Sequence, residues 1–478
     1  MPGEIKFLNH SCVEICSEKT TILCDPWFEG TAFGDGWSLL AEKTHNINQL
    51  KFDYIWISHE HPDHFSIATI KSLQSPAHFL FQETADKKVK TFLEKNGHTV
   101  TELKNKNSYK IGDLIITCVI CDGFDSSLIV DFPNGECLLN INDARVDIND
   151  HLKKEIAPLL NGRELNLLLL QFSYANWAGN AGDIDIPKYQ QSLVDNKNDF
   201  VIRALKPEAV MMFASFVYFS HVENYFWNDF HWIDHAFNKI SETGVKCILP
   251  SPNQSFVLGQ WNDEQINQTN SRSRTYWAEK LQDIKPITET NSVSLEILNS
   301  HYFKFIETIH KDNTIFKSRI QGKNYSLKLK ITDLNCVLSI GLFEREFELI
   351  KSCSSEVAID ISSETLQLLL TQPFARGTIA INGRARFNYD LAHKFFIFFF
   401  VFYANNIGIY FHEFNKLTFD KLMSITRSAV MDGVLQANPN AHSLIKQDIL
   451  DFLSCFNEEP YDKGDVDIFN QEPQNPDI

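Results

Sequence analysis

The stretch Ile57–Ser66, ISHEHPDHFS, brings three histidines and one aspartate together within six positions, directly after an apolar strand. The carboxyl end of a strand is where open α/β sheets place their ligand sites. Imidazole nitrogens and carboxylate oxygens are suitable ligands for Zn²⁺, Fe²⁺ and Mn²⁺. The spacing therefore predicts a metal site in which His59 and His61 bind one ion, and Asp63 and His64 bind a second.

The HxHxDH spacing after a hydrophobic strand resembles the metallo-β-lactamase superfamily. Further stretches are similar to the metallo-β-lactamase-like part of the CMP-N-acetylneuraminic acid hydroxylases, over roughly residues 5–261. These stretches are Asp25–Trp27, Ala32–Phe33, Gly36–Leu40, Ile57–His59, Leu139–Asp143, Phe213–Phe216 leading to Ser220-His221, and Pro250–Gly259. The resemblance implies an α/β fold, the αββα sandwich, and a metal-dependent enzyme.

The length of 478 residues predicts more than one domain. We expect a catalytic domain over 1–265, a polar connection over 266–292, a smaller α+β domain over 293–456 and a flexible acidic tail over 457–478. The segments Val357–Ile361, Ser362–Leu370 and Gly377–Gly383 of the smaller domain resemble sterol-carrier-type domains. That resemblance implies an apolar cavity, whereas a packing or dimerisation role remains the alternative.

Alternating and continuous apolar runs predict most of the strands. In the larger domain these are Glu4–Phe7, Thr21–Cys24, Tyr54–Ser58, His78–Phe81, Leu114–Cys121, Ser127–Phe132, Cys137–Ile141, Leu165–Phe172, Pro207–Phe213 and Lys246–Leu249, with helices over Ile67–Leu73 and Thr84–Asn96. In the smaller domain they are Leu327–Ile331, Val337–Leu342, Glu346–Ile350 and Val357–Ile361, followed by a turn at Pro373–Gly377 and an apolar helix after Asp390.

Composition narrows the classes of partner. The formal net charge of −17 disfavours nucleic acid and anionic membranes as general partners. The most apolar run, Phe395–Ala404, is about half the length of a membrane span and predicts a buried helix. The N-terminus lacks the pattern of a secretory signal, and the ten cysteines lack a disulfide framework. We therefore expect a cytoplasmic protein without a membrane span, acting on a small molecule.

The superfamily completes its site with residues at other strand ends. Asp143 follows the apolar strand that ends at Ile141 and fits the bridging aspartate. His221 follows the apolar run Val210–Phe219, which is interpreted as a strand, and resembles a histidine near the site. The usual middle histidine has no counterpart, and Asp122 or Asp125 stands in the expected place. A carboxylate there would make the site richer in oxygen, which favours iron or manganese over zinc. One ion or two both remain open.

Three further residues are candidates for the site. His10 follows the first strand and resembles a family position, although a structural histidine is the simpler interpretation. Tyr174 and Trp177 lie on a glycine-rich segment after an apolar strand and are candidates for substrate binding.

Two kinds of chemistry suit such a set of metal ligands. In a hydrolase the metal ionises a water that Asp63 or Asp143 orients, which makes these two aspartates catalytic candidates. In an oxygenase, iron held by histidines and carboxylates activates dioxygen. The hydroxylase resemblance implies the second, but the CxH motif of a Rieske centre does not occur in this sequence. Electrons would then come from a separate electron-transfer protein or from the substrate.

Overall fold

The chain forms two compact units, Met1–Thr288 and Glu289–Ile478. The computed structural model describes residues 2–41, 44–121, 125–230, 232–312, 325–342, 344–350, 356–406 and 410. The division between the units falls inside the predicted connection. Most of that connection is a helix, α6 (Asp263–Asp283), which buries Ile266 and Trp277. The predicted acidic tail lies outside the described residues.

The first sheet of the N-terminal unit contains seven strands in the order β16-β1-β2-β3-β5-β6-β7. Strand β3 runs parallel to β5, β5 to β6 and β6 to β7, so the carboxyl ends of these strands share one edge. The strands are β1 (Glu4–Asn9), β2 (Cys12–Cys16), β3 (Thr21–Cys24), β5 (Tyr54–Ile57), β6 (His78–Gln82), β7 (Thr99–Leu103) and β16 (Ser255–Val257).

The second sheet also has seven strands, in the order β15-β13-β12-β11-β10-β9-β8. Here β11, β12, β13 and β15 are parallel, and their continuous apolar sequences suit strands that are covered on both faces. The strands are β8 (Ser108–Ile111), β9 (Leu114–Cys121), β10 (Asp125–Asp131), β11 (Cys137–Asn142), β12 (Leu167–Gln171), β13 (Ala209–Phe213) and β15 (Lys246–Ile248).

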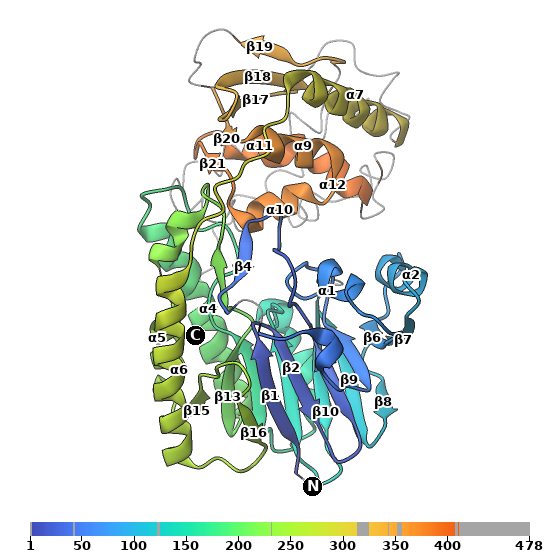
Figure 1. Ribbon diagram of the computed structural model, residues 1–478, viewed down its shortest axis with the longest axis vertical. Helices are drawn as coiled ribbons and strands as arrows, with labels where there is room; N and C mark the ends of the chain where they lie inside the picture. The colour runs from blue at the N-terminus through green and yellow to red at the C-terminus, as the bar shows by residue number, and fades with distance from the viewer. Residues whose placement is uncertain are drawn as a thin grey trace, which may run out of the picture. The chain divides into compact units, whose positions relative to one another are not determined.

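Helices cover the outer faces of both sheets (Figure 1). One buried cluster draws residues from both sheets, including Phe7, Trp56 and Leu169, and forms the interior of the sandwich. A second cluster lies between the first sheet and the short helices α1 and α2. The helices and helical turns of this unit are η1 (Ile47–Gln49), α1 (Ile67–Lys71), α2 (Lys88–Lys95), η2 (Ile148–Asp150), η3 (Leu152–Ile156), α3 (Ala157–Leu160), α4 (Asp185–Leu205), η4 (Tyr225–Asp229) and α5 (Ile233–Glu242). The predicted αββα architecture is confirmed.

The apolar run from Val210 to Phe219 is not one strand, which corrects the sequence interpretation. It breaks at Ala214, whose φ of +48° cannot continue a strand. Strand β13 ends just before this residue. The next strand, β14 (Val217–Phe219), leaves the large sheet and pairs with β4 (Trp37–Leu39). The break turns the chain toward the loop that holds His10, because the Ala214 amide donates to the His10 carbonyl at 3.0 Å.

The second unit contains a five-stranded sheet in the order β19-β18-β17-β20-β21. The predicted turn at Pro373–Gly377 is shorter than expected, because residues 375–382 are helical and Gly383 caps them with a φ of +65°. The elements are α7 (Leu295–Asp312), β17 (Ser326–Ile331), β18 (Cys336–Gly341), β19 (Glu348–Ile350), β20 (Ile359–Ile361), α9 (Ser363–Thr371), α10 (Ala375–Asn382), β21 (Arg386–Phe387), α11 (Ala392–Phe398) and α12 (Phe400–Asn406).

The apolar run Phe395–Ala404 spans α11 and α12, and most of its side chains are buried, as predicted for a core helix. Over the described ranges, every helix is too short or too polar to cross a bilayer.

Candidate metal centre

The HxHxDH residues follow β5 at the edge where the parallel strands end. Ile55, Trp56 and Ile57 are fully buried, so β5 anchors the start of the loop firmly. The loop then turns, because the amides of His64 and Phe65 both donate to the His61 carbonyl. Helix α1 starts directly afterwards, and its first turn is capped by the Ser66 hydroxyl, which accepts from the Thr69 amide at 3.2 Å. The histidines are therefore held between two well-defined elements.

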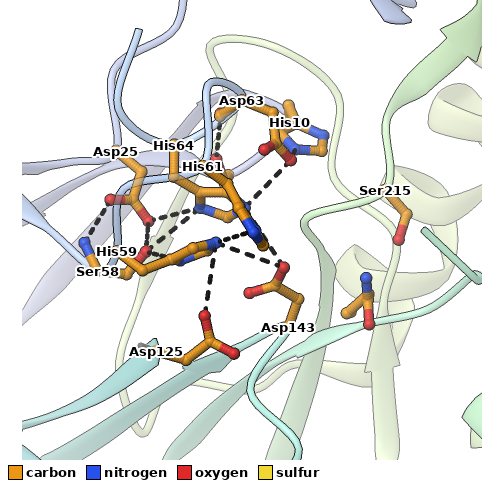
Figure 2. A network of polar contacts seen from close by, with 12 residues as sticks. His10, Asp25, Ser58, His59, His61, Asp63, His64, Asp125, Asp143 and Ser215 are labelled. Atoms are coloured by element: carbon orange, nitrogen blue, oxygen red, sulfur yellow. Dashed lines mark hydrogen bonds and ion pairs between the residues drawn. The ribbon is translucent and has the colours of Figure 1, made fainter. Parts of the chain in front are cut away.

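Asp25, at the end of β3, supports this loop from the neighbouring strand (Figure 2). Its Oδ1 accepts from the Ser58 amide and its Oδ2 from the Ser58 hydroxyl, both at 2.7 Å. The same Oδ2 lies 2.9 Å from Nδ1 of His64. A carboxylate that holds one ring nitrogen of a histidine leaves the other nitrogen available to a metal. Asp25 thus orients His64.

The first group of potential ligands is His59, His61 and Asp125, and the second is His59, His64 and Asp143. Nε2 of His59 lies 2.9 Å from Nδ1 of His61. The same nitrogen lies 3.6 Å from Oδ1 of Asp125 and 3.8 Å from Oδ2 of Asp143. Asp125 begins β10 and Asp143 follows β11, so the second sheet contributes the carboxylates.

A third group joins His10 to Asp63 and His64. His10 Nε2 and His64 Nε2 each lie 3.3 Å from Oδ2 of Asp63. His64 Nε2 also lies 3.8 Å from Oδ2 of Asp143, so His64 belongs to both the second and the third group. The three groups therefore form one continuous cluster of four histidines and three aspartates.

Unsatisfied polar atoms show that this cluster suits a metal ion. Oδ1 of Asp63 and Oδ1 of Asp143 are buried and make no hydrogen bond within the described structure, and Nε2 of His64 has, within hydrogen-bond distance, only the 3.3 Å contact with Oδ2 of Asp63. Leaving buried polar atoms unpaired is costly, and native proteins rarely do so without a ligand, water or ion. Nitrogen and carboxylate oxygen atoms that converge in this way are suitable ligands for a transition metal. The residues present thus fit the predicted one or two divalent ions.

The protonation states of the side chains in the cluster also suit metal binding. Burial lowers the pKa of His10, His59 and His61, which keeps these imidazoles neutral. Burial works against ionisation of Asp63, but the charge of His64 and hydrogen bonds from His10 and His64 outweigh it and hold the pKa of Asp63 well below its usual range.

His64 behaves differently from the other three histidines of the cluster. Burial lowers its pKa, but the charges of Asp63, Asp143 and Asp25 outweigh burial and raise the pKa well above the usual value. Without metal, His64 therefore carries the positive charge of the cluster. A metal ion would replace that proton.

Backbone strain marks the same place. His10, Asp25 and Asn142 all have positive φ angles, of +40°, +40° and +63°. Residues other than glycine rarely adopt this conformation, and such strain collects at functional sites. Each of these residues lies at a strand end next to the cluster. The sequence offered no signal of this strain, because none of the three positions is a glycine.

The structure does not bring every predicted site residue to the cluster. Asp122 lies outside the described residues. His221 is buried but belongs to none of the three groups; its Nδ1 accepts from the Glu223 amide at 3.2 Å. Tyr174 and Trp177 are also buried, and the Tyr174 ring stacks on Phe219 with centroids 6.4 Å apart. Their role in substrate binding stays a prediction.

Several residues that support the cluster were not identified as site residues from the sequence. Asp25 and Ser58 lie within stretches that resemble the family, but their local sequence does not indicate a role in the site. His10 was interpreted as a structural histidine, yet its ring lies against Asp63. The Ser215 hydroxyl accepts from the amides of Phe172 and Ser173 and ties the end of β12 to the β13–β14 link beside the cluster (Figure 2).

Residues 4–125 match the family model described as "Beta-lactamase superfamily domain". The match lies within the N-terminal unit and ends at Asp125. A cytidine monophosphate-N-acetylneuraminic acid hydroxylase of Danio rerio is 30% identical over 175 residues, which is 33% of this chain and 29% of the relative. The predicted resemblance to this superfamily and to these hydroxylases is therefore confirmed, although the chain matches under a third of that relative's length.

Two solved structures resemble the chain over 54% of its length. CmlA, a diiron β-hydroxylase from Streptomyces venezuelae, has a TM-score of 0.37 and 14% identity, with 54% of its own chain covered. An isothiocyanate hydrolase from Delia radicum gut bacteria has a TM-score of 0.39 and 14% identity, with all of its chain covered. At these values neither structure indicates an activity. The comparisons do not support the sterol-carrier resemblance of the second unit.

Proposed function

We propose that the N-terminal unit is a metal-dependent enzyme, and specifically a non-heme iron oxygenase that hydroxylates a small molecule. The observation that carries this proposal is the set of ligands. Asp125 lies beside His59 and His61, where the superfamily pattern has a third histidine. Three carboxylates among seven candidate ligands make the cluster rich in oxygen. Such a donor set favours iron or manganese over zinc.

The cluster divides naturally between two ions. His59, His61 and Asp125 would hold one, Asp63, His64 and His10 would hold the other, and Asp143 lies within reach of both. Bound iron would supply the activation of dioxygen. The protein residues around it have separate tasks: Asp25 fixes the orientation of His64, and Ser58 connects Asp25 to His59 through its hydroxyl, 3.0 Å from Nδ1 of His59.

The hydroxylase relatives support an oxidative reaction, since their names state that activity. They do not identify the substrate, because the matched part covers 29% of the relative. An oxygenase also needs a source of electrons. Because this sequence contains no Rieske motif, we propose that a separate electron-transfer protein or the substrate itself supplies them.

A dinuclear zinc hydrolase is the second candidate. The specific observation in its favour is the position of Asp143, whose Oδ2 lies 3.8 Å from ring nitrogens of both His59 and His64. A carboxylate shared between two ions suits the two-metal hydrolysis of esters, amides or phosphodiesters. The two candidates therefore share the same ligand residues and differ in the metal that these residues bind.

Elemental analysis of protein purified without added metal tests the proposal. We expect iron in the wild type and a loss of most metal in His59→Ala. A matched control is His78→Ala on β6, because His78 bonds to Thr101 and belongs to none of the three ligand groups. Metal content that is equal in all three proteins would contradict the assigned site, and zinc alone in the wild type would favour the hydrolase.

A further inference from the structure

A buried lysine lies near the metal centre, and the chemistry proposed above gives it no task. Lys197 is on α4 and its residue is 3% exposed. Its Nζ donates one hydrogen bond, to Oε1 of Gln171 at 3.3 Å. Asp143 exerts the strongest attraction on its charge, followed by Asp147. Gln171 ends β12, the neighbour of the strand that leads to Asp143, so the ammonium group lies at the same edge of the second sheet as this proposed ligand.

The environment of Lys197 leaves its charge poorly compensated. An ammonium group has three donors, and one of them is used. No carboxylate in the described part of the chain forms an ion pair with it, since Asp147 is bound by Arg145 and Asp143 lies in the histidine cluster. Burial consequently lowers the pKa of Lys197 to about 8. Burying an unpaired charge is costly, so this position favours function over stability.

Metal binding would increase the excess of positive charge around Lys197. The negative charge that now attracts Lys197 belongs mainly to Asp143, a candidate ligand. Two divalent ions carry more positive charge than the three ligand carboxylates can balance. Once those ions are bound, the region around Lys197 has an excess of positive charge. An anion placed between the lysine and the ions would restore the balance.

A neutral hydrogen-bond donor near Lys197 fits the same ligand. Gln171 ends β12, and both amide atoms of Asn142, which ends the neighbouring β11, are buried without a hydrogen bond among the described residues. Asn142 directly precedes Asp143. Asn198, the next residue on α4, donates to the Gln171 carbonyl at 2.9 Å, but its own Oδ1 has no partner. Nδ2 of Asn142 is therefore a free donor for an oxygen atom of the ligand, whereas the unpaired Oδ1 atoms of Asn142 and Asn198 are acceptors and do not bond to it.

We propose that Lys197 binds an oxyanion of the substrate, a carboxylate or a phosphate, beside the metal ions held at Asp143. This inference rests on the proposed function, because it requires the metal centre. It adds a substrate class to that function: a small molecule whose anionic group lies near the carbon or bond that reacts. Lys197 acts here as a binding and positioning residue.

The test is anion binding by the metal-loaded protein. Inorganic phosphate and acetate are titrated separately by calorimetry into the wild type, Lys197→Met and Lys197→Arg. We expect Lys197→Met to weaken binding of at least one anion by about tenfold or more, the effect of one charge-assisted hydrogen bond. Lys197→Arg keeps the charge and should retain part of the affinity. The preferred anion distinguishes a phosphate substrate from a carboxylate substrate.

The matched control is Lys188→Met, an exposed lysine on the same helix, which should bind anions as the wild type does. Anions that bind only to the metal ions would be insensitive to Lys197→Met, and that result would overturn the inference. Binding of neither anion by the metal-loaded wild type would also overturn it. Metal content is measured on every sample, so that absence of metal refutes the proposed function, while normal metal with unchanged anion binding refutes the role of Lys197 alone.

Protein stability gives an independent check that Lys197→Met has folded. If the lysine served only to balance the aspartates, its removal would lower the melting temperature of the metal-free protein. The proposal requires a melting temperature that is unchanged or raised, because an uncompensated buried charge has been removed.

Discussion

Asp25 determines which nitrogen of His64 is available to a metal. Its Oδ2 lies 2.9 Å from Nδ1 of His64, and its Oδ1 accepts from the Ser58 amide. A carboxylate can only accept, so Nδ1 carries the proton and Nε2 keeps its lone pair when the imidazole is neutral. In Asp25→Asn the remaining oxygen stays with the Ser58 amide, and the new NH₂ group faces Nδ1. The proton of His64 then moves to Nε2, the atom that should bind the ion.

The size of the effect follows from these contacts. Asp25→Asn removes one charge-assisted hydrogen bond, which contributes about 1.5–3 kcal/mol, and imposes the wrong tautomer on His64. That energy corresponds to a loss of roughly 10- to 100-fold in metal affinity. The backbone around Ser58 should keep its conformation, because the hydrogen bond from the Ser58 amide is retained.

Competition with a chelator measures the affinity directly. The matched control is Asp53→Asn, because Asp53 is exposed and accepts from the Thr21 amide at 2.8 Å on the same sheet, without contacting a histidine of the cluster. The control should bind metal as the wild type does. Unchanged metal affinity in Asp25→Asn, with the fold intact by circular dichroism, would refute the orienting role of Asp25.

Three further outcomes are expected. Asp125→His should shift the ratio of bound zinc to iron toward zinc, by elemental analysis, because it replaces an oxygen ligand by nitrogen; an unchanged ratio would count against Asp125 as a ligand. His221→Ala should leave the metal content unchanged, since His221 lies outside the ligand groups, and loss of metal would show that it binds an ion. The pKa of Lys197 is about 8, below its ordinary value of 10.5. Below pH 8 the buried charge therefore destabilises the metal-free fold by its full amount, and this cost decreases as the pH rises toward 10.5. Urea unfolding should therefore show Lys197→Met more stable at pH 7 by up to about 3 kcal/mol and the difference vanishing above pH 10.5, whereas a pH-independent difference would contradict this.

The sequence predicted the fold class because two local patterns were unambiguous. Buried strands such as Leu167–Gln171 appear as continuous apolar runs, and the HxHxDH loop follows one of them. Short or polar strands escaped detection. Strand β14 was merged with β13, because a positive φ at Ala214 leaves no trace in an apolar sequence.

The site was predicted where its residues are close along the chain, and less well where they are not. His59 to His64 and the strand-end position of Asp143 were recognisable from local context. His10 lies 53 positions from Asp63, and only the pairing of β1, β2, β3 and β5 brings their loops together. Lys197 was missed because one lysine on a polar helix carries no signal of burial. His221 was favoured because it follows an apolar run, but the chain leaves the large sheet before reaching it.

Binding of iron by this cluster, and its reaction with oxygen, can be measured in one experiment. The visible spectrum of the anaerobically purified protein is recorded, together with its metal content, before and after exposure to air. We expect roughly two irons per chain and a change in absorption on adding oxygen. Near-stoichiometric zinc with no response to oxygen would contradict this expectation.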